Sequence, residues 1–209
     1  MPKGSDELTR ARRNEIIAAC AELYETMSFK DISLKDIAQK TSFTRTSIYN
    51  YFVTKEEIFL ALLQREYEQW VADLRALSAR AAEGLSIEAF ADALAGTLEA
   101  RRRLLKIMTM NVYEMEVNSR PEKLAEMKAA FGASLRAVEV CLAAAFPSMT
   151  AEQREAFVYA FFPFVYGLHA YAEVSAKQRE AMALAGVPFH YHSIRELARS
   201  CICALLSGL

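Results

Sequence analysis

The sequence is poor in the two residue types that most often interrupt helices. It has seven glycines and five prolines in 209 residues, about half the usual share of these residues. This shortage favours long helices over a turn-rich β fold. Hydrophobic residues make up 53% of the chain and charged residues 24%, a composition that supports a substantial core and excludes intrinsic disorder. We expect an all-α protein.

The chain also lacks an excess charge of either sign, since 25 basic residues face 26 acidic ones. A net charge of −1 argues against a nucleic-acid partner unless a local basic segment is hidden in the total. No apolar run follows Met1, so the sequence shows no secretion signal. The four cysteines, Cys20, Cys141, Cys201 and Cys203, are scattered. Reduced thiols in a cytoplasmic protein are therefore expected.

One uncharged stretch, residues 156–172, reaches the lower limit of a membrane-spanning length. It contains Pro163, His169 and three tyrosines, and it is flanked directly by Glu155 and Glu173. These features indicate a helix buried in protein, so we expect no membrane partner.

Start and stop signals divide the chain into helices. Capping boxes begin at Ser33 and Thr54, each with an acidic residue three positions later. Thr44 can cap the short helix between them. The first predicted helix ends near residue 28. The later predicted helices span about 34–40, 44–51, 55–82, 86–118 (one or two helices), 121–146, 150–176 and 193–206. We expect a helix-turn-helix domain over 1–53 and a helical domain over 54–209, connected by the helix from about residue 55.

The third predicted helix has an apolar inner face and a polar outer face. Ile48 and Phe52 lie four residues apart and can pack against Ile37. The other side carries hydroxyls, an arginine and an amide, which suit phosphate oxygens and base edges. Between Thr26 and Lys55, five basic residues face two acidic ones, a local net charge of +3. This local charge weakens the objection from the total.

Residues 32–58 resemble the DNA-binding domain of the TetR/AcrR transcriptional regulators. The specific marks are the hydrophobic positions, the run from Tyr49 to Phe52 with tyrosine at both 49 and 51, and Lys55 followed by Glu56. The close resemblance covers about residues 10–63. The rest of the chain agrees with the family in length and helical character.

The resemblance implies roles for eight residues. Four would face bases or the nearby backbone: Arg45, Thr46, Ser47 and Asn50. Two would bind phosphates, Tyr49 and Lys55, and two would present helix N-termini to the DNA backbone, Ser33 and Thr44. The chain departs from the family pattern at Ser42, where glycine is frequent, and we expect this serine to adopt a positive φ at a cost of roughly 1 kcal/mol. Thr46 also replaces a frequent glycine, which affects the base preference.

No catalytic or cofactor motif is visible beyond residue 86. The sequence has no Gly-rich phosphate loop, no nucleophile elbow and no His-Glu-x-x-His. His190 and His192 provide two imidazoles, which is an incomplete metal site. We therefore expect no enzyme activity, no cofactor and no bound metal.

The helix predicted over 150–176 is apolar on nearly all sides, and the last helix carries a broad apolar stripe. One side of each can pack in its own domain, and the other can meet a second copy of the chain across a two-fold axis. A purely intramolecular core is the alternative. The predicted dimer interface is Phe157, Phe161, Phe164, Leu168, Ile194, Leu197, Cys201, Ile202 and Leu205.

A second set of residues could line an apolar pocket with a few polar groups. They are Met108, Asn111, Tyr113, Phe131, Phe162, Tyr166 and His169, although each is also compatible with ordinary core packing. The sequence does not decide which stripe of the 150–176 helix faces the pocket and which faces the partner. Such a pocket would bind a small apolar or aromatic effector.

These observations favour a ligand-responsive, homodimeric DNA-binding regulator. We expect a cytoplasmic repressor that binds a near-palindromic operator in double-stranded DNA and is released by its effector. The alternative is a helical-bundle carrier of a hydrophobic ligand, or an enzyme, that does not bind DNA.

Overall fold

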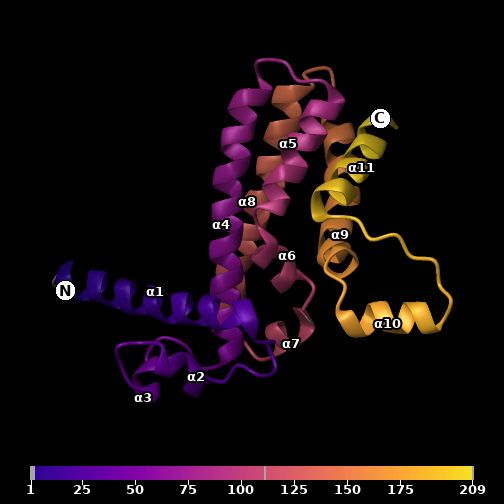
Figure 1. Ribbon diagram of the computed structural model, residues 1–209. Helices are drawn as coiled ribbons and strands as arrows, with labels where there is room; N and C mark the ends of the chain where they lie inside the picture. Colours follow the sequence, from indigo (N-terminus) through magenta and orange to yellow (C-terminus); the bar gives the residue numbers. More distant parts are fainter. Residues whose placement is uncertain (1–2, 111, 209) are drawn as a thin grey trace. The chain divides into compact units, whose positions relative to one another are not determined.

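The computed structural model describes residues 3–110 and 112–208, with side chains described from Asp6 onward except those of Val112 and Tyr113. These residues form helices and no strand, which confirms the all-α prediction (Figure 1). The helices are α1 (Lys3–Thr26), α2 (Leu34–Gln39), α3 (Arg45–Ile48), α4 (Lys55–Ala81), α5 (Ile87–Glu99), α6 (Arg102–Met108), α7 (Val112–Val117), α8 (Pro121–Ala145), α9 (Ala151–Ala172), α10 (Ala176–Leu184) and α11 (Ile194–Ser207).

Helix ends follow the local signals closely where a cap is present. Ser33, Thr150 and Ser193 each accept a hydrogen bond from the third residue of their helix, whose side chain bonds back to the cap. These reciprocal bonds satisfy two backbone N–H groups that the helix itself leaves unpaired. α4 ends shortly before Gly84, whose φ of +91° is favourable for glycine.

Two parts of the predicted helix pattern differ from the structure. The stretch 86–118 forms three helices, α5, α6 and α7. Between α5 and α6, Arg101 leaves helical geometry and its guanidinium binds Asp73 and Gln69 of α4. α10 was not predicted, because none of its residues is buried and an unburied helix has no apolar periodicity to detect.

The chain divides into two compact units, and two helices contribute to both. The first unit comprises the described residues within 1–66 and 111–131, and the second those within 67–110 and 132–209. α4 and α8 each pass from one unit to the other. The predicted boundary between residues 53 and 54 falls inside the first unit.

The core of the first unit joins α1 to the short helices and to the start of α4. Tyr24 of α1 and Phe29 both meet the ring of Phe59 edge-on, with centroids 5.2 and 4.8 Å away. Ile48 and Phe52 are fully buried, as their spacing predicted. The short helices α2 and α3 thus owe their position to packing, since helices of this length are not stable alone.

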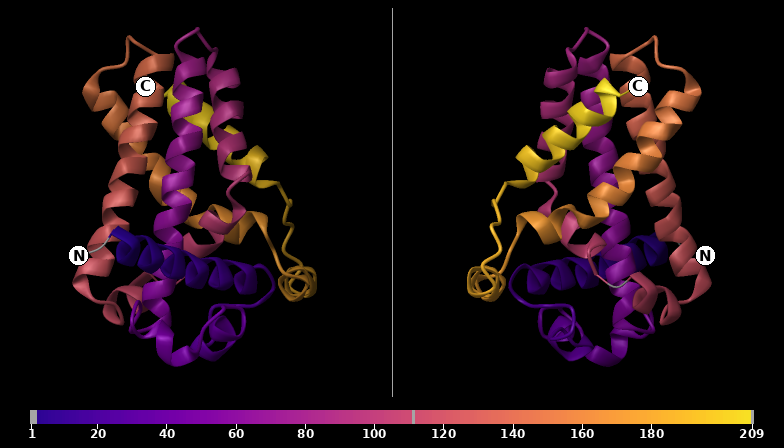
Figure 2. Two further views of the ribbon diagram at one scale, coloured as in Figure 1. Left: turned by 90° about the vertical axis from the view of Figure 1, so that its left-hand side faces the viewer. Right: turned by 90° about the vertical axis from the view of Figure 1, so that its right-hand side faces the viewer.

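The core of the second unit is built mainly from α5, α9 and α11 with the C-terminal part of α4. α11 packs on both α5 and α9. Trp70 of α4 is fully buried, and its indole N–H donates to Thr97 of α5 at 2.9 Å. α10 stands apart from the other helices of this unit in both views (Figures 1 and 2). Among the described residues, none of the helices combines the length and apolarity that a membrane crossing requires.

Candidate nucleic-acid interface

The helix-turn-helix presents a polar surface around α3, fixed from beneath by apolar side chains. Ile37 of α2 and Ile48 of α3 are completely buried. Most of the neighbouring polar residues predicted to face DNA are exposed, and Ser47 is half-buried: Thr44, Arg45, Thr46, Ser47, Tyr49 and Asn50. The structure therefore brings these six predicted residues together on one short segment (Figure 1).

Arg45 and Tyr49 form a pair on this surface. The guanidinium donates to the phenol oxygen at 3.1 Å and lies 5.9 Å from the ring centroid. Tyr49 is 46% exposed, so neither group is withdrawn from solvent by the contact. The pair restricts the rotamers of two long side chains, which lowers the entropy lost when both bind a partner.

Ser33 and Thr44, the two residues predicted to present helix N-termini to the DNA backbone, differ in their hydrogen bonds. The Ser33 hydroxyl donates to the Asp36 carboxylate at 2.6 Å and accepts from the Asp36 N–H, and its own N–H donates to the same carboxylate. These bonds hold the pKa of Asp36 below its usual range. A phosphate at Ser33 would compete with this carboxylate. Thr44 forms no cap bond with the backbone, and its hydroxyl instead lies 3.2 Å from that of Ser47.

Ser42 corrects our expectation of a strained turn. No described residue other than glycine has a positive φ, so the turn between α2 and α3 does not require glycine. The backbone N–H and the hydroxyl of Ser42 both donate to the carboxylate of Glu15 on α1. Sequence reasoning missed this tie, because residues 27 positions apart give no local signal of their contact.

Lys55 is not placed as a free phosphate ligand. Its ammonium donates to the carbonyls of Phe29 and Ile32, at 2.8 and 3.1 Å, and lies 4.3 Å from the centroid of the Phe29 ring. These contacts join the start of α4 to the segment between α1 and α2. In this conformation Lys55 stabilises the loop, and the phosphate-binding role implied by the resemblance stays a prediction.

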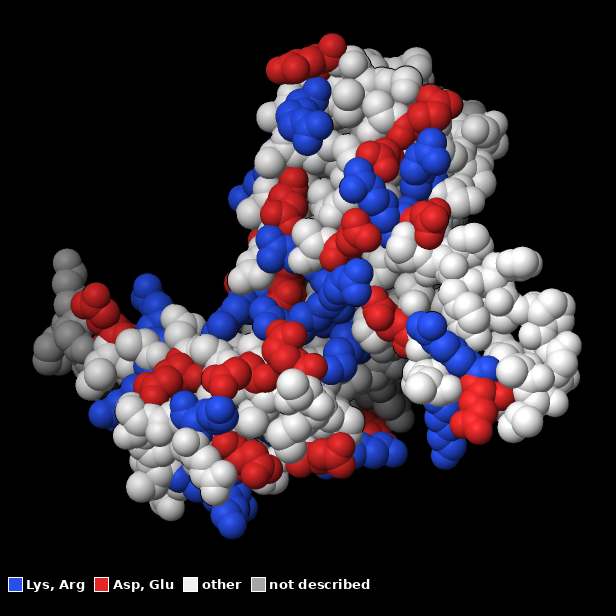
Figure 3. Space-filling model, viewed as in Figure 1, with Lys and Arg blue, Asp and Glu red and all other residues white. Residues whose placement is uncertain are grey.

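Charges of both signs are interspersed over the first unit rather than separated. Figure 3 shows basic and acidic side chains alternating on the visible face. Lys40 and Glu22, for example, form an exposed pair at 2.6 Å. The polar surface around α3 therefore offers individual hydrogen-bond donors rather than a broad positive field.

The predicted dimer residues fall into two groups. Five are buried in the chain's own core and have no surface left for a partner: Phe157, Phe161, Leu168, Ile194 and Ile202. Four retain exposed surface on α9 and α11: Phe164, Leu197, Cys201 and Leu205. Between these helices lies an apolar hollow of about 290 Å³ lined by Pro163, Phe164, Gly167, Leu168, Tyr171 and Leu197.

Comparison with known proteins identifies both parts of the chain. Residues 16–62 match the family model described as bacterial regulatory proteins, tetR family. Residues 64–209 match the model of the tetracyclin repressor-like C-terminal domain. The chain belongs to the tetR family.

Curated relatives of this tetR-family protein match over part of the chain. The HTH-type transcriptional regulator RutR of Escherichia coli K12 is 27% identical over 66 residues, which are 32% of this chain and 31% of RutR. The uncharacterized HTH-type transcriptional regulator YfiR of Bacillus subtilis is 25% identical over 93 residues, 44% of this chain and 45% of YfiR. The chain thus spans less than half the length of these relatives in the matches.

Solved structures of similar fold cover nearly the whole chain. A TetR-family regulator from Mesorhizobium loti has a TM-score of 0.64 and 18% identity, with 96% of this chain and 97% of that one covered. FadR of Thermus thermophilus, solved in complex with lauroyl-CoA, has a TM-score of 0.58 and 19% identity over 95% of each chain. At these identities the likeness shows the fold.

The predicted effector residues of this tetR-family protein are only partly described. Met108 and Phe162 are buried in the second unit, where Tyr166 and His169 are half-buried. Phe131 is half-buried in the first unit. Asn111 and the side chain of Tyr113 lie outside the described residues.

Aromatic residues of α4 contact two of the predicted effector residues on α9, Phe162 and Tyr166. The Trp70 and Phe162 rings lie 5.8 Å apart, and the hydroxyls of Tyr67 and Tyr166 are 3.3 Å apart. Burial lowers the pKa of His169, against the opposing effect of Glu173, so its imidazole is neutral at pH 7. Sequence reasoning missed Tyr67 and Trp70, because their helix was interpreted only as a connector.

Three or more metal-ligating side chains do not gather anywhere among the residues that the structure describes. His192 instead lies 4.0 Å from Glu196 in the first turn of α11. The family identity indicates a transcriptional regulator.

Proposed function

We propose that this protein is a homodimeric repressor that binds a near-palindromic operator and is released by an apolar or aromatic small molecule. It would act in the cytoplasm, where bacterial DNA lies, and without enzyme activity. The observation that carries the proposal is the exposed cluster Arg45, Thr46, Tyr49 and Asn50 on a segment anchored by the buried Ile48.

The chemistry of this cluster suits the major groove. An arginine fork can bind guanine, and an asparagine amide can bind adenine through two hydrogen bonds each. Tyr49, held beside Arg45, has a phenol that can donate to a phosphate oxygen. α3 itself has only four residues, so the turn that follows it supplies Tyr49 and Asn50.

The dimer is supported by the exposed apolar surface of α9 and α11. Tyr171 is 65% exposed, and it borders the hollow beside Pro163 and Leu197. A second copy related by a two-fold axis would cover this surface and present two helix-turn-helix segments to two half-sites. We narrow the proposed interface to Phe164, Leu197, Cys201 and Leu205.

The effector is supported by the aromatic region between α4 and α9. Phe162 and Trp70 provide apolar surface, whereas Tyr166 and the neutral His169 provide hydrogen-bonding groups. This combination suits a largely apolar ligand oriented by a few polar contacts. FadR of T. thermophilus binds lauroyl-CoA, and for this chain we propose only that its effector is small and apolar or aromatic.

A gel-shift titration with the DNA upstream of its own coding sequence tests the proposal. We expect sequence-specific binding by the wild-type dimer, and Arg45→Ala should weaken it by about 1–3 kcal/mol and relax the base preference at one position of each half-site. Lys177→Ala, which removes an exposed cation from α10, is the matched control and should bind like wild type. Absence of specific binding by the folded wild type, or equal binding by Arg45→Ala, would contradict the assignment.

A further inference from the structure

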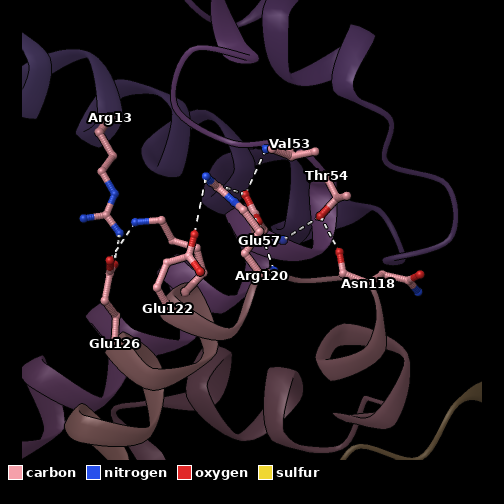
Figure 4. A network of polar contacts seen from close by, with 9 residues as sticks. Arg13, Val53, Thr54, Glu57, Asn118, Arg120, Glu122 and Glu126 are labelled. Atoms are coloured by element: carbon pink, nitrogen blue, oxygen red, sulfur yellow. Dashed lines mark hydrogen bonds and ion pairs between the residues drawn. The ribbon is translucent and has the colours of Figure 1, made fainter.

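Glu57 is a buried carboxylate at the start of α4 that holds two distant parts of the first unit together. Its side chain is 1% exposed. It accepts the Val53 N–H at 2.9 Å and three N–H groups of Arg120, from the backbone at 3.2 Å, Nε at 2.6 Å and Nη2 at 2.8 Å (Figure 4). Arg120 lies 63 residues away in the chain, between α7 and α8.

The two residues of the capping box predicted at Thr54 also form hydrogen bonds with the same distant segment. The Thr54 hydroxyl accepts the Glu57 N–H at 3.2 Å, as a cap should, but it also donates to the carbonyl of Asn118 at 2.9 Å. The Glu57 carboxylate bonds to the N–H of Val53 instead of that of Thr54. Both residues of the box therefore use residues 118–120 as partners.

A second attachment joins α1 to the start of α8. Arg13 donates to Glu126 at 2.8 Å and its guanidinium lies 5.7 Å from the ring centroid of Phe52. Lys123 donates to the other oxygen of Glu126 at 2.6 Å. Figure 4 shows the pair Arg13–Glu126 beside the contacts of Glu57. Residues 118–126 are thus bonded both to α1, through Arg13, and to the start of α4, through Glu57.

The partners at residues 118–126 lie outside the stretch that matches the N-terminal family model. That model ends at residue 62, whereas residues 118–126 fall within the match to the C-terminal model. Sequence that belongs to the C-terminal domain by family therefore completes the DNA-binding unit by packing. In the pair Glu57–Arg120 the carboxylate is buried, whereas the arginine side chain is 42% exposed.

We propose that Glu57 and Arg120 form a latch through which the α7–α8 junction sets the affinity of the helix-turn-helix for DNA. The two are positioning residues: Val53 follows the turn that carries Tyr49 and Asn50, and the latch fixes its backbone. This inference rests on the proposed function, because it assumes that the α3 surface binds DNA.

The latch has two distinct arrangements because Glu57 is charged. While Arg120 is in place, the buried carboxylate is fully bonded. If Arg120 moves away, the charge is left buried with too few partners, and the start of α4 must rearrange to expose it to water. A displacement of the α7–α8 junction is thereby converted into a change at Val53. The equilibrium between the two arrangements of the latch can be shifted from more than one site on the protein.

The test compares two variants near the start of α8 in the full-length protein. Arg120→Leu removes the latch, and Lys128→Leu is the control, since it removes a partly exposed ion pair between α8 and Glu116 of α7. Backbone amide exchange, followed by NMR, reports on the Val53 N–H without any DNA. In Arg120→Leu we expect faster exchange at Val53 and a Kd for the protein's own upstream DNA raised about 5–150-fold. The control should change neither quantity.

Each outcome bears on a separate part of the proposal. Unchanged exchange at Val53 in Arg120→Leu would overturn the latch, and faster exchange with an unchanged Kd would overturn its effect on DNA binding. Failure of the wild type itself to bind DNA would overturn the proposed function, and the exchange data would still decide the latch. If the leucine variant does not fold, Arg120→Lys replaces it. This variant keeps the charge but loses the two-pronged geometry, so it should show a smaller change in both quantities.

Discussion

At the scale of single residues, the residues predicted to bind DNA divide into exposed side chains and side chains that are bonded to other segments of the protein. Arg45 and Asn50 are exposed, whereas Lys55 and Ser33 are bonded within the protein. The exposure of the α3 residues could be predicted, because Ile48 and Phe52 define the buried face by spacing alone. The engagement of Lys55 could not, because its acceptors are backbone carbonyls 23 and 26 positions earlier.

Lys55→Met should destabilise the protein while leaving its surface cluster intact. The change removes the donor to the carbonyls of Phe29 and Ile32 and the contact with the Phe29 ring, and we expect a loss of about 1–3 kcal/mol in the free energy of unfolding. Urea unfolding measures this loss. Lys30→Met, at an exposed position in the same loop, should unfold like wild type. A Lys55 variant as stable as the control would restore a purely phosphate-binding role.

The charge of Glu57 predicts how stability depends on pH. Burial raises the pKa of this carboxyl, but the bonds from Arg120 and Val53 outweigh it, so the pKa is lowered overall. A carboxyl with a lowered pKa in the folded state stabilises the protein above its unfolded pKa of about 4.3, and this contribution is lost as the pH falls through the folded value.

Wild type should therefore be more stable than Glu57→Gln by about 1–3 kcal/mol at pH 7, and the difference should shrink below about pH 4. Unfolding of both proteins at several pH values measures it. Glu122→Gln is the control, since this exposed residue lies 3.7 Å from the same Arg120. A difference that stays constant down to pH 3 would contradict the assigned pKa direction.

At the scale of helices, a cap together with a buried face made an element predictable from the sequence. α2, α9 and α11 begin at Ser33, Thr150 and Ser193, where a hydroxyl is followed three residues later by a carboxylate or amide. α10 has a cap at Ser175 but no buried face. The break between α5 and α6 depends on Arg101 reaching α4, a tertiary contact that periodicity does not encode.

Helices α9 and α11 also show why the proposed interface was drawn too broadly. The stripe with Phe157 and Phe161 is strongly apolar, but periodicity cannot distinguish a face buried within the chain from one buried by a partner. The structure assigns this stripe to the core, and the remaining apolar surface lies around Phe164 and Leu197.

Leu197→Asp should break the proposed dimer. The leucine lines the apolar hollow beside α9, and a carboxylate there would be buried without a partner in the interface. Analytical ultracentrifugation should show the wild type as a dimer and this variant shifted toward monomer at micromolar concentration. Val140→Asp, at an exposed apolar position on α8, should remain dimeric. A monomeric wild type would contradict the interface outright.

At the scale of the whole molecule, the two family models and the two compact units divide the chain differently. The models meet between residues 62 and 64, whereas the first unit also takes in residues 111–131. The resemblance of residues 32–58 was sufficient to predict a DNA-binding end, because its marks are local. It gave no indication that the α7–α8 junction belongs to the same unit, since that contact joins segments more than 50 residues apart.

The overall charge follows from the same division of roles. A total of −1 conceals a segment with a local net charge of +3. On the face that Figure 3 shows, basic and acidic groups of the first unit are interspersed, and we propose that the donors at Arg45 and Asn50 provide specificity. A protein of this kind should bind DNA through few phosphate contacts and a defined base sequence.

The central claim is that the folded dimer recognises one DNA sequence through the α3 surface. The most direct test measures DNA affinity by fluorescence anisotropy at several salt concentrations. It compares the DNA fragment upstream of the protein's own coding sequence with a scrambled fragment of equal length. The account predicts at least about a thousandfold preference for the upstream fragment and an affinity that falls linearly on a log–log plot with salt. Equal affinity for both fragments, or no binding to either, would contradict it.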